Sequence, residues 1–518
     1  MFMKSFYLTT PIYYVNSVPH LGTAYTTIAA DALARYRRMT GHDVHFLTGL
    51  DEHGQKVAQA AAENGTEPQA WVDTIAPKFV EAWKMLDITY DDFIRTTEGR
   101  HVRGAQAFLQ VLKDSGDLYQ GHYEGWYCVP DETFYTEEQL ADGKCPGCGR
   151  DVQFIREDNW FFRLSAYQDR LLAHYEAHPE FIQPETRRNE VVSFVSGGLK
   201  DLSVSRTTFT WGIPLPFDDE HVMYVWFDAL LNYITAIGYG DPDRAEEFAK
   251  RWPAQYQFVG KDIIRFHCAI WPAMLMAAGL PLPETVFAHG FLLTKGEKMS
   301  KSKGNAVAPA DLVARFGVDA YRHYFLRDVP FGADGSISME GMVQRYNGDL
   351  ANDWGNLVSR LLNMTEKYCD GVVPEPPADA DATADDLELR GIAEALPATY
   401  EAAMARLDYV GALEAAWMLI KRANRYIEDA APWNLAKSDE TRPRLLAVLY
   451  DALESVRIAA LFTAPVMPNT SAEVWRRLGI GDPCSVTDIA AESVWGKLPA
   501  GSLVVKGDAL FPRIYEEE

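Results

Sequence analysis

The sequence predicts an α/β protein whose parallel-sheet domain is split by an insertion and followed by a helical domain. Three observations support this prediction. The chain opens with a strand, a helix and a second strand, which is the usual start of a parallel sheet. The pattern changes near Gly116, and sheet-like signals resume at residues 256–259 and 286–293. From Met342 onward the pattern is almost wholly helical.

The first three elements follow from the spacing of apolar residues. Residues 5–10 and 44–48 are short apolar runs of the kind found in buried strands. Between them, apolar side chains recur at helical intervals until Gly41 ends the pattern. The residues on the predicted buried face are Leu21, Tyr25, Ile28, Ala32 and Tyr36. We therefore expect a helix that connects two neighbouring parallel strands.

The rest of the chain divides by composition. Residues 117–222 mix short strand-like pieces with a cysteine cluster, and a loop rich in Pro, Ala and Asp at residues 374–386 interrupts the helical part. We predict four segments. They are the first half of the sheet domain (1–115), a connecting insertion (116–222), the second half of the sheet domain (223–340) and the helical domain (341–518).

Composition limits the class of protein. The chain has 518 residues, of which 47% are apolar, enough for several domains with large cores. No apolar run reaches the roughly 18 residues of a membrane span, and the N-terminus has no signal-peptide pattern, so we expect a cytoplasmic protein with no membrane partner. The formal net charge of -24 argues against a nucleic-acid partner, although basic residues cluster at 295–303, 421–425 and 442–444.

The strongest local motif, residues 19–23, lies at the predicted turn from strand to helix. The start of a helix presents unpaired N–H groups and partial positive charge, which attract phosphate. Gly22 lets a ligand approach the backbone closely, and His20 can donate a hydrogen bond to a phosphate oxygen. Taken alone, this motif fits a structural histidine better than a triphosphate site.

A second motif strengthens the phosphate interpretation. Residues 298–302 read Lys-Met-Ser-Lys-Ser and lie between Gly296 and Gly304. Lys298 and Lys301 in such a loop form a cationic clamp suited to the charge on a transferring phosphoryl group. An isolated pair of this kind is more often a solvated basic loop, but this one follows the second half of the sheet domain.

Together the two motifs resemble the HIGH and KMSKS signatures of class I aminoacyl-tRNA synthetases. The resemblance implies a Rossmann-type catalytic domain, an aminoacyl-adenylate intermediate, ATP with Mg²⁺, and an α-helical anticodon-binding domain. It implies His20, Lys298 and Lys301 as catalytic residues. The implied ATP contacts are His20, Gly22, Thr23, Asp262, Lys298, Ser300 and Lys301. Thr23 departs from the family signature, which has histidine there, so the part that Thr23 plays is open.

Two further segments concern the amino-acid substrate. Asp51 follows the second predicted strand, at the sheet edge where ligands bind, and its carboxylate can pair with an α-ammonium group. A helix-capping aspartate is the alternative. Aromatic residues within 224–233 and 263–271 suit a slot for a flexible thioether, because sulfur–ring contacts are favourable. Such rings are, however, more often part of a core.

Both segments resemble the methionine-pocket motifs of methionyl-tRNA synthetases. The resemblance implies a ligase that activates L-methionine with ATP to methionyl-adenylate. The ligase then transfers the methionine to the 3′ end of tRNA(Met) and releases AMP. The resemblance also implies that Asp262 contacts the ribose. The implied methionine contacts are Ile12, Tyr14, Asp51, Trp226, Ala229, Tyr233, Ile263 and His267.

The cysteine cluster of the insertion predicts a metal knuckle in a reducing compartment. Relatives with one zinc ion pair two Cys-x-x-Cys or Cys-x-x-His motifs, whereas here an aspartate stands at one ligand position. Carboxylate oxygens also bind zinc, and four protein ligands make a structural site. We expect a structural Zn²⁺ held by Cys128, Asp131, Cys145 and Cys148, with a metal-free knuckle as the alternative.

Three residues of the helical part are candidates for binding RNA. Asn356 and Arg360 share one helix face, and Trp433 opens another helix. Amide, guanidinium and indole groups bind unstacked bases, although each alone is more often helix surface or core. The resemblance implies that they read the CAU anticodon of initiator and elongator tRNA(Met). No appended dimerising domain follows residues 510–514, so we expect a monomer.

Two alternatives stay open. One is a class I synthetase for another amino acid, with cysteine nearest in size, although the zinc ligands of cysteine enzymes are not found beside Asp51. The other is a non-catalytic RNA-binding or scaffold protein, which Thr23 and the acidic charge favour and His20, Lys298 and Lys301 oppose. A screen of amino acids in ATP–pyrophosphate exchange would separate these readings.

Overall fold

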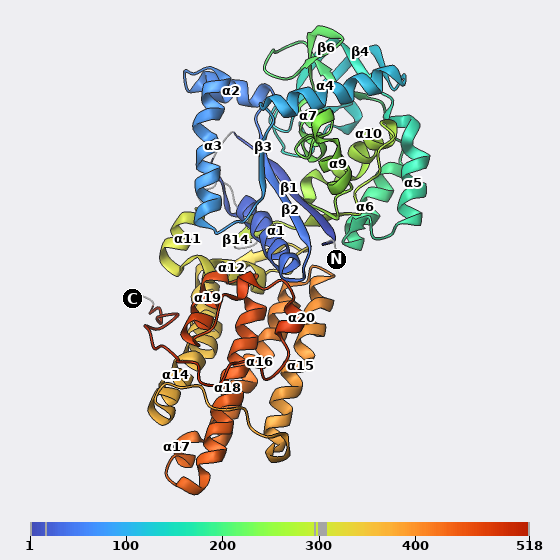
Figure 1. Ribbon diagram of the computed structural model, residues 1–518. Helices are drawn as coiled ribbons and strands as arrows, with labels where there is room; N and C mark the ends of the chain where they lie inside the picture. Colours follow the sequence, from blue (N-terminus) through green and yellow to red (C-terminus); the bar gives the residue numbers. More distant parts are fainter. Residues whose placement is uncertain (1–2, 16–17, 295–296, 299–307, 516–518) are drawn as a thin grey trace.

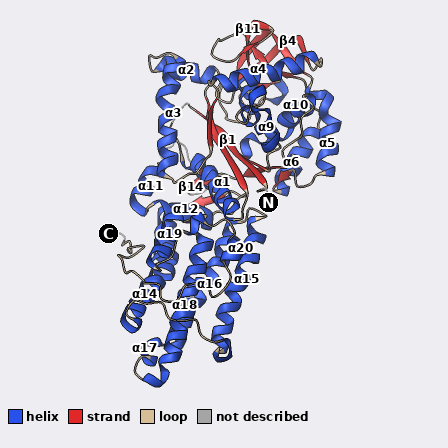
Figure 2. Ribbon diagram, viewed as in Figure 1, coloured by secondary structure: helices blue, strands red, loops and turns tan. Residues whose placement is uncertain are grey.

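The computed structural model describes residues 3–15, 18–294, 297–298 and 308–515. Figure 1 shows two bodies joined end to end, an upper one built around a parallel sheet and a lower one of long helices. The strands are confined to the upper body, as the colouring of Figure 2 shows. No helix in the described part of the chain has the length and apolar character that a membrane span requires.

The central sheet has six parallel strands in the order β3-β2-β1-β12-β13-β7. The chain runs outward from β1 to β3 on one side and from β12 to β13 on the other, so the direction reverses between β1 and β12. A ligand in an open parallel sheet binds at such a reversal, beyond the carboxyl ends of the strands. The strands are β1 (Ser5–Tyr14), β2 (Asp43–Asp51), β3 (Asp92–Arg95), β7 (Ile182–Gln183), β12 (Tyr256–Gly260) and β13 (Thr285–His289).

The predicted strand–helix–strand opening is confirmed, but β1 is longer than predicted. The strand continues past Pro11 to Tyr14, because a register shift between Thr9 and Ile12 accommodates the proline. The hydroxyl of Thr10 is buried and bonds to the hydroxyl of Thr48 at 2.8 Å, which satisfies both polar groups inside the sheet.

Helices cover both faces of the sheet, and β1 shows why. Phe6 and Leu8 belong to one hydrophobic core, and Tyr7 between them belongs to the other, as expected of alternating side chains. The helices of this body are α1 (Leu21–Met39), α2 (Gln55–Glu63), α3 (Pro68–Met85), α4 (Gly99–Asp114), α7 (Val225–Leu230), α8 (Asn232–Thr235), α9 (Ala245–Arg251), α10 (Trp271–Ala277), α11 (Pro309–Phe316) and α12 (Val318–Asp328).

The strand predicted over residues 286–293 is wrong as a single element. The chain leaves the main sheet at His289 and forms β14 (Leu292–Thr294), which pairs with β15 (Glu297–Lys298) and β16 (Gly335–Ile337) in a separate sheet. The break falls at Gly290, where a Cβ atom would lie 2.2 Å from the carbonyl carbon of Ala333. Only glycine permits this close crossing of two backbones.

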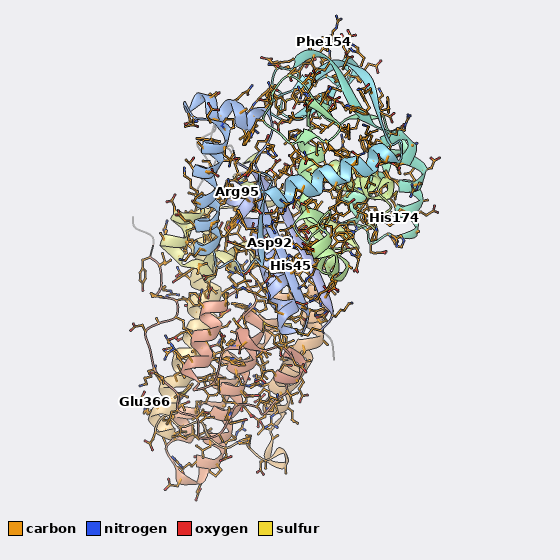
Figure 3. All side chains as sticks on the ribbon, turned by 45° about the horizontal axis from the view of Figure 1, so that its top comes forward. His45, Asp92, Arg95, Phe154, His174 and Glu366 are labelled. Atoms are coloured by element: carbon orange, nitrogen blue, oxygen red, sulfur yellow. The ribbon has the colours of Figure 1, made fainter. Side chains whose placement is uncertain are left out.

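The insertion forms its own antiparallel sheet in the order β5-β4-β6-β8. It also supplies β7, the edge strand of the main sheet, a pairing that the composition of residues 117–222 did not indicate. Figure 3 shows Phe154, on β6, at the outer end of the insertion and Arg95, at the end of the edge strand β3, in the sheet body. The elements are β4 (Leu118–Cys128), β5 (Thr133–Tyr135), β6 (Gln153–Phe162), α5 (Gln168–Ala177), α6 (Glu185–Ser196), β8 (Leu202–Ser203), β9 (Ser205–Arg206), β10 (Pro214–Leu215) and β11 (Asp218–Met223).

The helical body joins the sheet body around one buried arginine, which contacts residues of both bodies. Arg322 on α12 contacts Asp31 on α1 at 2.6 Å, and both side chains are fully buried. The guanidinium also donates to the carbonyl oxygens of Leu86, Pro465 and Val466. The helices of this body are α13 (Met339–Arg345), α14 (Asn356–Cys369), α15 (Ala384–Met404), α16 (Tyr409–Ala430), α17 (Pro432–Leu435), α18 (Arg442–Thr463), α19 (Pro468–Arg477) and α20 (Ile489–Glu492).

Candidate functional site

The sequence motifs gather at the carboxyl edge of the main sheet. Asp51 is the last residue of β2, His20 is the cap residue before α1, and Asp262 follows β12. All three therefore lie beside the reversal of strand order between β1 and β12. Lys298 ends β15, while Ser300 and Lys301 lie outside the described residues.

His20 caps the first turn of α1. Its Nδ1 accepts hydrogen bonds from the backbone N–H groups of Gly22 and Thr23 at 3.1 and 3.3 Å, so the ring proton is on Nε2. The ring is exposed, and a Cβ atom at Gly22 would lie 3.1 Å from its Cε1. This arrangement fixes the ring at the helix start with a donor nitrogen directed away from the helix.

Thr23 closes the same cap from the other side. Its hydroxyl donates to the carbonyl oxygen of His20 at 2.7 Å and accepts from the N–H of His20 at 3.0 Å. The two residues thus form a capping box, in which both donors at the helix start are satisfied. The Thr23 hydroxyl is committed to the backbone that holds His20.

A second histidine ties the two halves of the sheet together near this helix. His289, the last residue of β13, contacts the Thr26 hydroxyl through Nε2 at 2.6 Å and donates through Nδ1 to the carbonyl of Gly290 at 2.8 Å. Burial lowers the pKa of His289, so the ring is neutral. The pair holds the start of α1 against the end of β13.

The segment after β12 presents one acidic and one basic residue. Asp262 is exposed, and its Oδ1 lies so close to Gly260 that a Cβ atom there would be 2.4 Å away. Lys261 is bound to both carboxylate oxygens of Asp334 at 2.7 Å. The charge of Lys261 is therefore neutralised, while the Asp262 carboxylate faces outward.

Asp51 and Glu52 are adjacent carboxylates with different surroundings. Glu52 accepts from Arg95 Nε at 2.7 Å and from the Thr97 hydroxyl at 2.5 Å. Asp51 is 5% exposed, and its Oδ1 has no hydrogen-bond partner in the described part of the chain. Burial, with help from the carboxylates of Asp228, Glu132 and Glu52, raises the pKa of Asp51 well above its usual range. Asp51 is thus a buried carboxyl that has no cationic partner among the described residues.

A buried network positions the residues after Asp51, and the sequence did not predict it. Asp228 on α7 accepts from His53 Nδ1 at 2.7 Å and from His101 Nε2 at 2.6 Å. Although burial opposes ionisation, the two histidines hold the pKa of Asp228 at about 2. His53 and Asp228 both lie inside motifs that resembled the methionine pocket, which was the only signal in the sequence that could have found them.

Rings and apolar side chains pack beside Asp51. Trp226 stacks on Phe266 with ring centroids 3.9 Å apart and planes inclined by 12°. Five predicted methionine contacts belong to one hydrophobic core or pack against it, and they are Ile12, Tyr14, Trp226, Tyr233 and Ile263. Ala229, on the same helix as Trp226, is also buried. A flexible apolar group would find contacts on several sides here.

Tyr233 and His267 form a fully buried polar pair within this cluster. Tyr233 donates its hydroxyl proton to Nε2 of His267 at 2.7 Å, and Nδ1 of His267 donates to the carbonyl of Ile263 at 3.0 Å. Burial lowers the pKa of His267 to about 4, so the ring is neutral at physiological pH. His267 belongs to a π-helical turn, Phe266–Ile270, and such turns often occur at functional sites.

The four predicted metal ligands lie together. Their ligand atoms are within 4.8 Å of one another, with Cys128 Sγ 3.5 Å from Cys148 Sγ and Cys145 Sγ 3.1 Å from Asp131 Oδ2. The backbone N–H of Gly147 points at Cys145 Sγ over 3.3 Å. Neighbouring ligand atoms around tetrahedral zinc lie about 3–4 Å apart, so the four residues fit such an ion.

Asn356 and Arg360 lie on the first turns of α14. Asn356 is exposed, and Arg360 contacts Glu428 near the end of α16 at 3.6 Å. Trp433, on the next short helix α17, is 43% exposed. The three groups therefore lie on elements at the lower end of the helical body, where Figure 1 shows α14 and α17.

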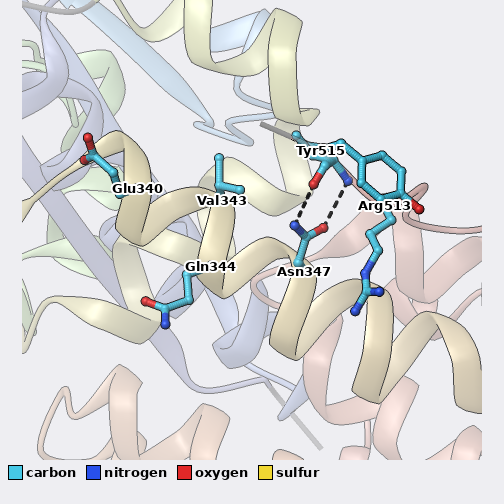
Figure 4. Close-up of a pocket in the computed structure, with 7 residues that line it drawn as sticks. Glu340, Val343, Gln344, Asn347, Arg513 and Tyr515 are labelled. Atoms are coloured by element: carbon cyan, nitrogen blue, oxygen red, sulfur yellow. Dashed lines mark hydrogen bonds between the residues drawn. The ribbon is translucent and has the colours of Figure 1, made fainter. Parts of the chain in front are cut away.

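The helical body contains pockets that are separate from the predicted site. The pocket in Figure 4, of about 540 Å³, lies where the C-terminal segment packs on α13, and Asn347 exchanges two hydrogen bonds with the backbone of Ile514. A smaller one, of about 240 Å³, lies between the end of α14 and the segment after α17. None of the predicted site residues lines either pocket.

Two family models match almost the whole length of the chain. The family model described as tRNA synthetases class I (M) matches residues 6–156 and 152–362, and that of the anticodon-binding domain of methionyl tRNA ligase matches residues 376–518. The chain is 52% identical over 515 residues to the methionine–tRNA ligase of Caldanaerobacter subterraneus subsp. tengcongensis, covering 99% of this chain and 80% of that protein. It is 48% identical over 530 residues to the methionine–tRNA ligase of Streptomyces coelicolor, covering 99% and 97%.

A solved structure is similar over the same length. The methionyl-tRNA synthetase of Mycobacterium tuberculosis in complex with methionyl-adenylate superposes with a TM-score of 0.94 at 46% identity, covering 99% of this chain and 100% of that one. The similarity extends across the sheet body, the insertion and the helical body.

Proposed function

Since the chain belongs to the class I tRNA synthetases of the methionine type, the methionine–tRNA ligases, we propose how its own residues carry out that reaction. Asp51 binds the α-ammonium group of L-methionine. The observation that carries this assignment is the contrast between three neighbouring carboxylates. Glu52 and Asp228 have cationic or hydrogen-bonding partners, and only Asp51 keeps a buried oxygen without one.

The thioether chain occupies the ring-lined space beside Asp51. Contacts with Trp226, Ala229 and Ile263 suit a flexible apolar chain, and sulfur–ring contacts add to them. Ile12 and Tyr14 approach from the end of β1, and the Tyr233–His267 pair forms the inner wall. Because this wall is neutral, it does not attract a charged side chain in place of the thioether.

The first step is the formation of methionyl-adenylate. A carboxylate oxygen of methionine attacks the α-phosphorus of ATP, the bond to the bridging oxygen breaks, and pyrophosphate leaves. His20 donates Nε2–H to the phosphates, Gly22 gives them access to the helix start, and Asp262 binds the ribose. Thr23 contributes indirectly, by holding the backbone of His20. Bound Mg²⁺ would neutralise phosphate charge, and Lys298, Ser300 and Lys301 would complete the clamp.

The second step transfers methionine to tRNA. The terminal ribose hydroxyl attacks the adenylate carbonyl carbon, the bond from that carbon to the phosphate oxygen breaks, and AMP leaves. The hydroxyl proton passes to the departing phosphate, which serves as the base. Positioning, rather than a protein nucleophile, accounts for the rate in both steps.

Replacing the second motif lysine tests the clamp. Lys301→Ala should lower the rate of methionine-dependent ATP–pyrophosphate exchange at least about a hundredfold, because one cation is lost from the transferring phosphates. The methionine Kd, measured by tryptophan fluorescence, should stay nearly unchanged. Lys303→Ala, a lysine of the same loop outside the motif, serves as the control. Equal exchange rates in both variants would remove Lys301 from the mechanism.

Trp433 tests the RNA-binding assignment together with Asn356 and Arg360. Trp433→Ala should weaken tRNA(Met) charging about tenfold or more, since stacking on one base contributes roughly 1–3 kcal/mol. Exchange in the absence of tRNA should be normal. Met418→Ala, which removes another exposed side chain of the same body, should charge tRNA normally. Equal losses in exchange and charging would indicate a folding defect instead.

A zinc ion held by Cys128, Asp131, Cys145 and Cys148 would have a structural role, because four protein ligands leave no position for water. We expect about one zinc ion per chain by elemental analysis, and its loss in Cys148→Ser with a lower Tm. Cys484→Ser, outside the cluster, should keep its zinc. Wild-type protein that folds with no bound metal would favour the metal-free knuckle.

A further inference from the structure

Glu132, the residue after Asp131 in the knuckle, points away from the metal cluster into the sheet body. It is 3% exposed and has φ of 47°, in the left-handed region that non-glycine residues seldom adopt. A conformation of this kind persists only where the surroundings hold it. The side-chain contacts that hold Glu132 in this conformation lie outside the knuckle.

The side chain and the carbonyl of Glu132 contact Tyr14, a candidate methionine contact, and residues close to Asp51 and Trp226 in sequence. The Tyr14 hydroxyl donates to Glu132 Oε2, and the backbone N–H of Lys56 donates to Oε1 at 3.3 Å. Tyr224 lies two residues before Trp226, and its hydroxyl donates to the Glu132 carbonyl at 2.5 Å. A Cβ atom at Gly54 would lie 2.6 Å from both Glu132 Oε1 and the Tyr14 oxygen.

The charge of Glu132 has no ion-pair partner within the described ranges of the chain. Lys56 points its ammonium group at the carbonyl of Pro130 and over the ring of Tyr14. Arg206, the other nearby cation, is paired with Glu157 at 3.1 Å. Burying a carboxylate without an ion-pair partner costs folding free energy, so a ligand that brings a positive charge would be favoured.

Tyr14 connects this carboxylate to Asp51. The two residues are direct neighbours in the pairing of β1 with β2, at the carboxyl ends of both strands. The Tyr14 phenol has a single proton, and the close contact with Glu132 uses it. The phenol oxygen is thereby left as an acceptor for an N–H group beside Asp51. Without Glu132, the same proton would turn to another acceptor, such as the carbonyl of His53 at 3.0 Å.

We propose that Glu132 is a positioning and specificity-determining residue for the α-ammonium group of the amino-acid substrate, acting through the Tyr14 hydroxyl. This inference rests on the proposed site around Asp51. Glu132 keeps the phenol oxygen an acceptor and adds a second negative charge near the ammonium group. Ligands that carry the ammonium group gain from it, and ligands that lack it do not.

The test compares two ligands in one variant. At pH 8, Glu132→Gln should raise the Kd of methionine about 10- to 100-fold, as expected for a lost hydrogen bond to a charged group. The Kd of 4-(methylthio)butanoate, which has the same thioether chain and carboxylate but no ammonium group, should change less than about twofold. The KM for ATP should be unchanged, and kcat should fall less than the methionine affinity does.

Controls separate a positioning role from a structural one. Glu138→Gln, an exposed acid of the same insertion, should bind both ligands normally. Equal weakening of both ligands by Glu132→Gln, or no effect on methionine, would overturn the inference. If Glu132→Gln does not fold, Tyr14→Phe should show the same loss for methionine alone. Asp51→Asn distinguishes the proposed amino-acid site from the role of Glu132. If Asp51→Asn weakens methionine binding and Glu132→Gln does not, only the role of Glu132 is rejected.

Discussion

Asp51→Asn is expected to raise the methionine Kd by at least about 100-fold, because the ammonium group loses its charged partner in a buried site. ATP binding should be almost unchanged, since the proposed partner of Asp51 is the ammonium group of methionine and not ATP. Titration calorimetry with methionine alone measures the effect. Asp219→Asn, an exposed aspartate on β11, is a matched control and should bind normally. An unchanged Kd in Asp51→Asn would remove the amino-acid site from this edge of the sheet.

The raised pKa of Asp51 predicts how methionine binding and stability depend on pH. Without substrate, the carboxyl keeps its proton to a higher pH than an ordinary aspartate does, and the ammonium group must displace that proton. Methionine should therefore bind more weakly as the pH falls through the pKa of Asp51, with proton release visible in buffers of different ionisation enthalpy. Above the unfolded pKa of about 3.9, the buried charge opposes folding, so Asp51→Asn should raise the Tm of the substrate-free protein.

Arg322→Ala is expected to lower the free energy of unfolding by roughly 3–5 kcal/mol, because a buried ion pair loses one partner. Asp31 would keep Arg35 as its ion-pair partner, and the carbonyl oxygens of Leu86, Pro465 and Val466 would lose the donor that Arg322 provides. Calorimetry should show a large fall in Tm, and limited proteolysis should cut between the two bodies. Arg425→Ala, whose side chain is 78% exposed, should change the free energy by less than about 0.5 kcal/mol.

The same pair predicts a response to acid. Arg35 and Arg322 hold the pKa of Asp31 at about 2, although its burial alone would raise it. The folded pKa is thus below the unfolded value of about 3.9. The stabilisation is complete above that value and is lost as the pH falls toward 2, so wild type and Arg322→Ala should converge in Tm over this range. A constant difference in Tm would show that the pair contributes through packing alone.

Local pattern was enough to predict the elements that make contacts close in sequence. β1, α1 and β2 follow from apolar spacing, because both faces of the sheet are covered and the central helix needs a continuous apolar stripe. Asp51 could be assigned because the end of a strand is a defined position in a parallel sheet. The metal cluster also follows from spacing, since each pair of ligands lies within one turn of the chain.

The residues that the sequence did not reveal are those whose partners are distant. Glu132 is bonded to Tyr14, Asp228 is bonded to His53 and His101, and nothing local marks any of these side chains as unusual. The strand β7 was missed because two residues carry no periodicity, and only its pairing with β13 makes it a strand. Such features depend on where the chain brings separate segments together.

The Tyr233–His267 pair, which we propose as the inner wall of the thioether slot, has a chemical consequence of its own. The Tyr233 hydroxyl donates its proton to His267, and the ring N–H of His267 donates to the carbonyl of Ile263. The two side chains therefore have no hydrogen-bond donor left for a ligand. The sulfur of methionine needs none. A sulfoxide oxygen would leave water without gaining a donor from these two residues, a cost of about 1–3 kcal/mol. The Tyr233–His267 pair should therefore favour methionine over its sulfoxide.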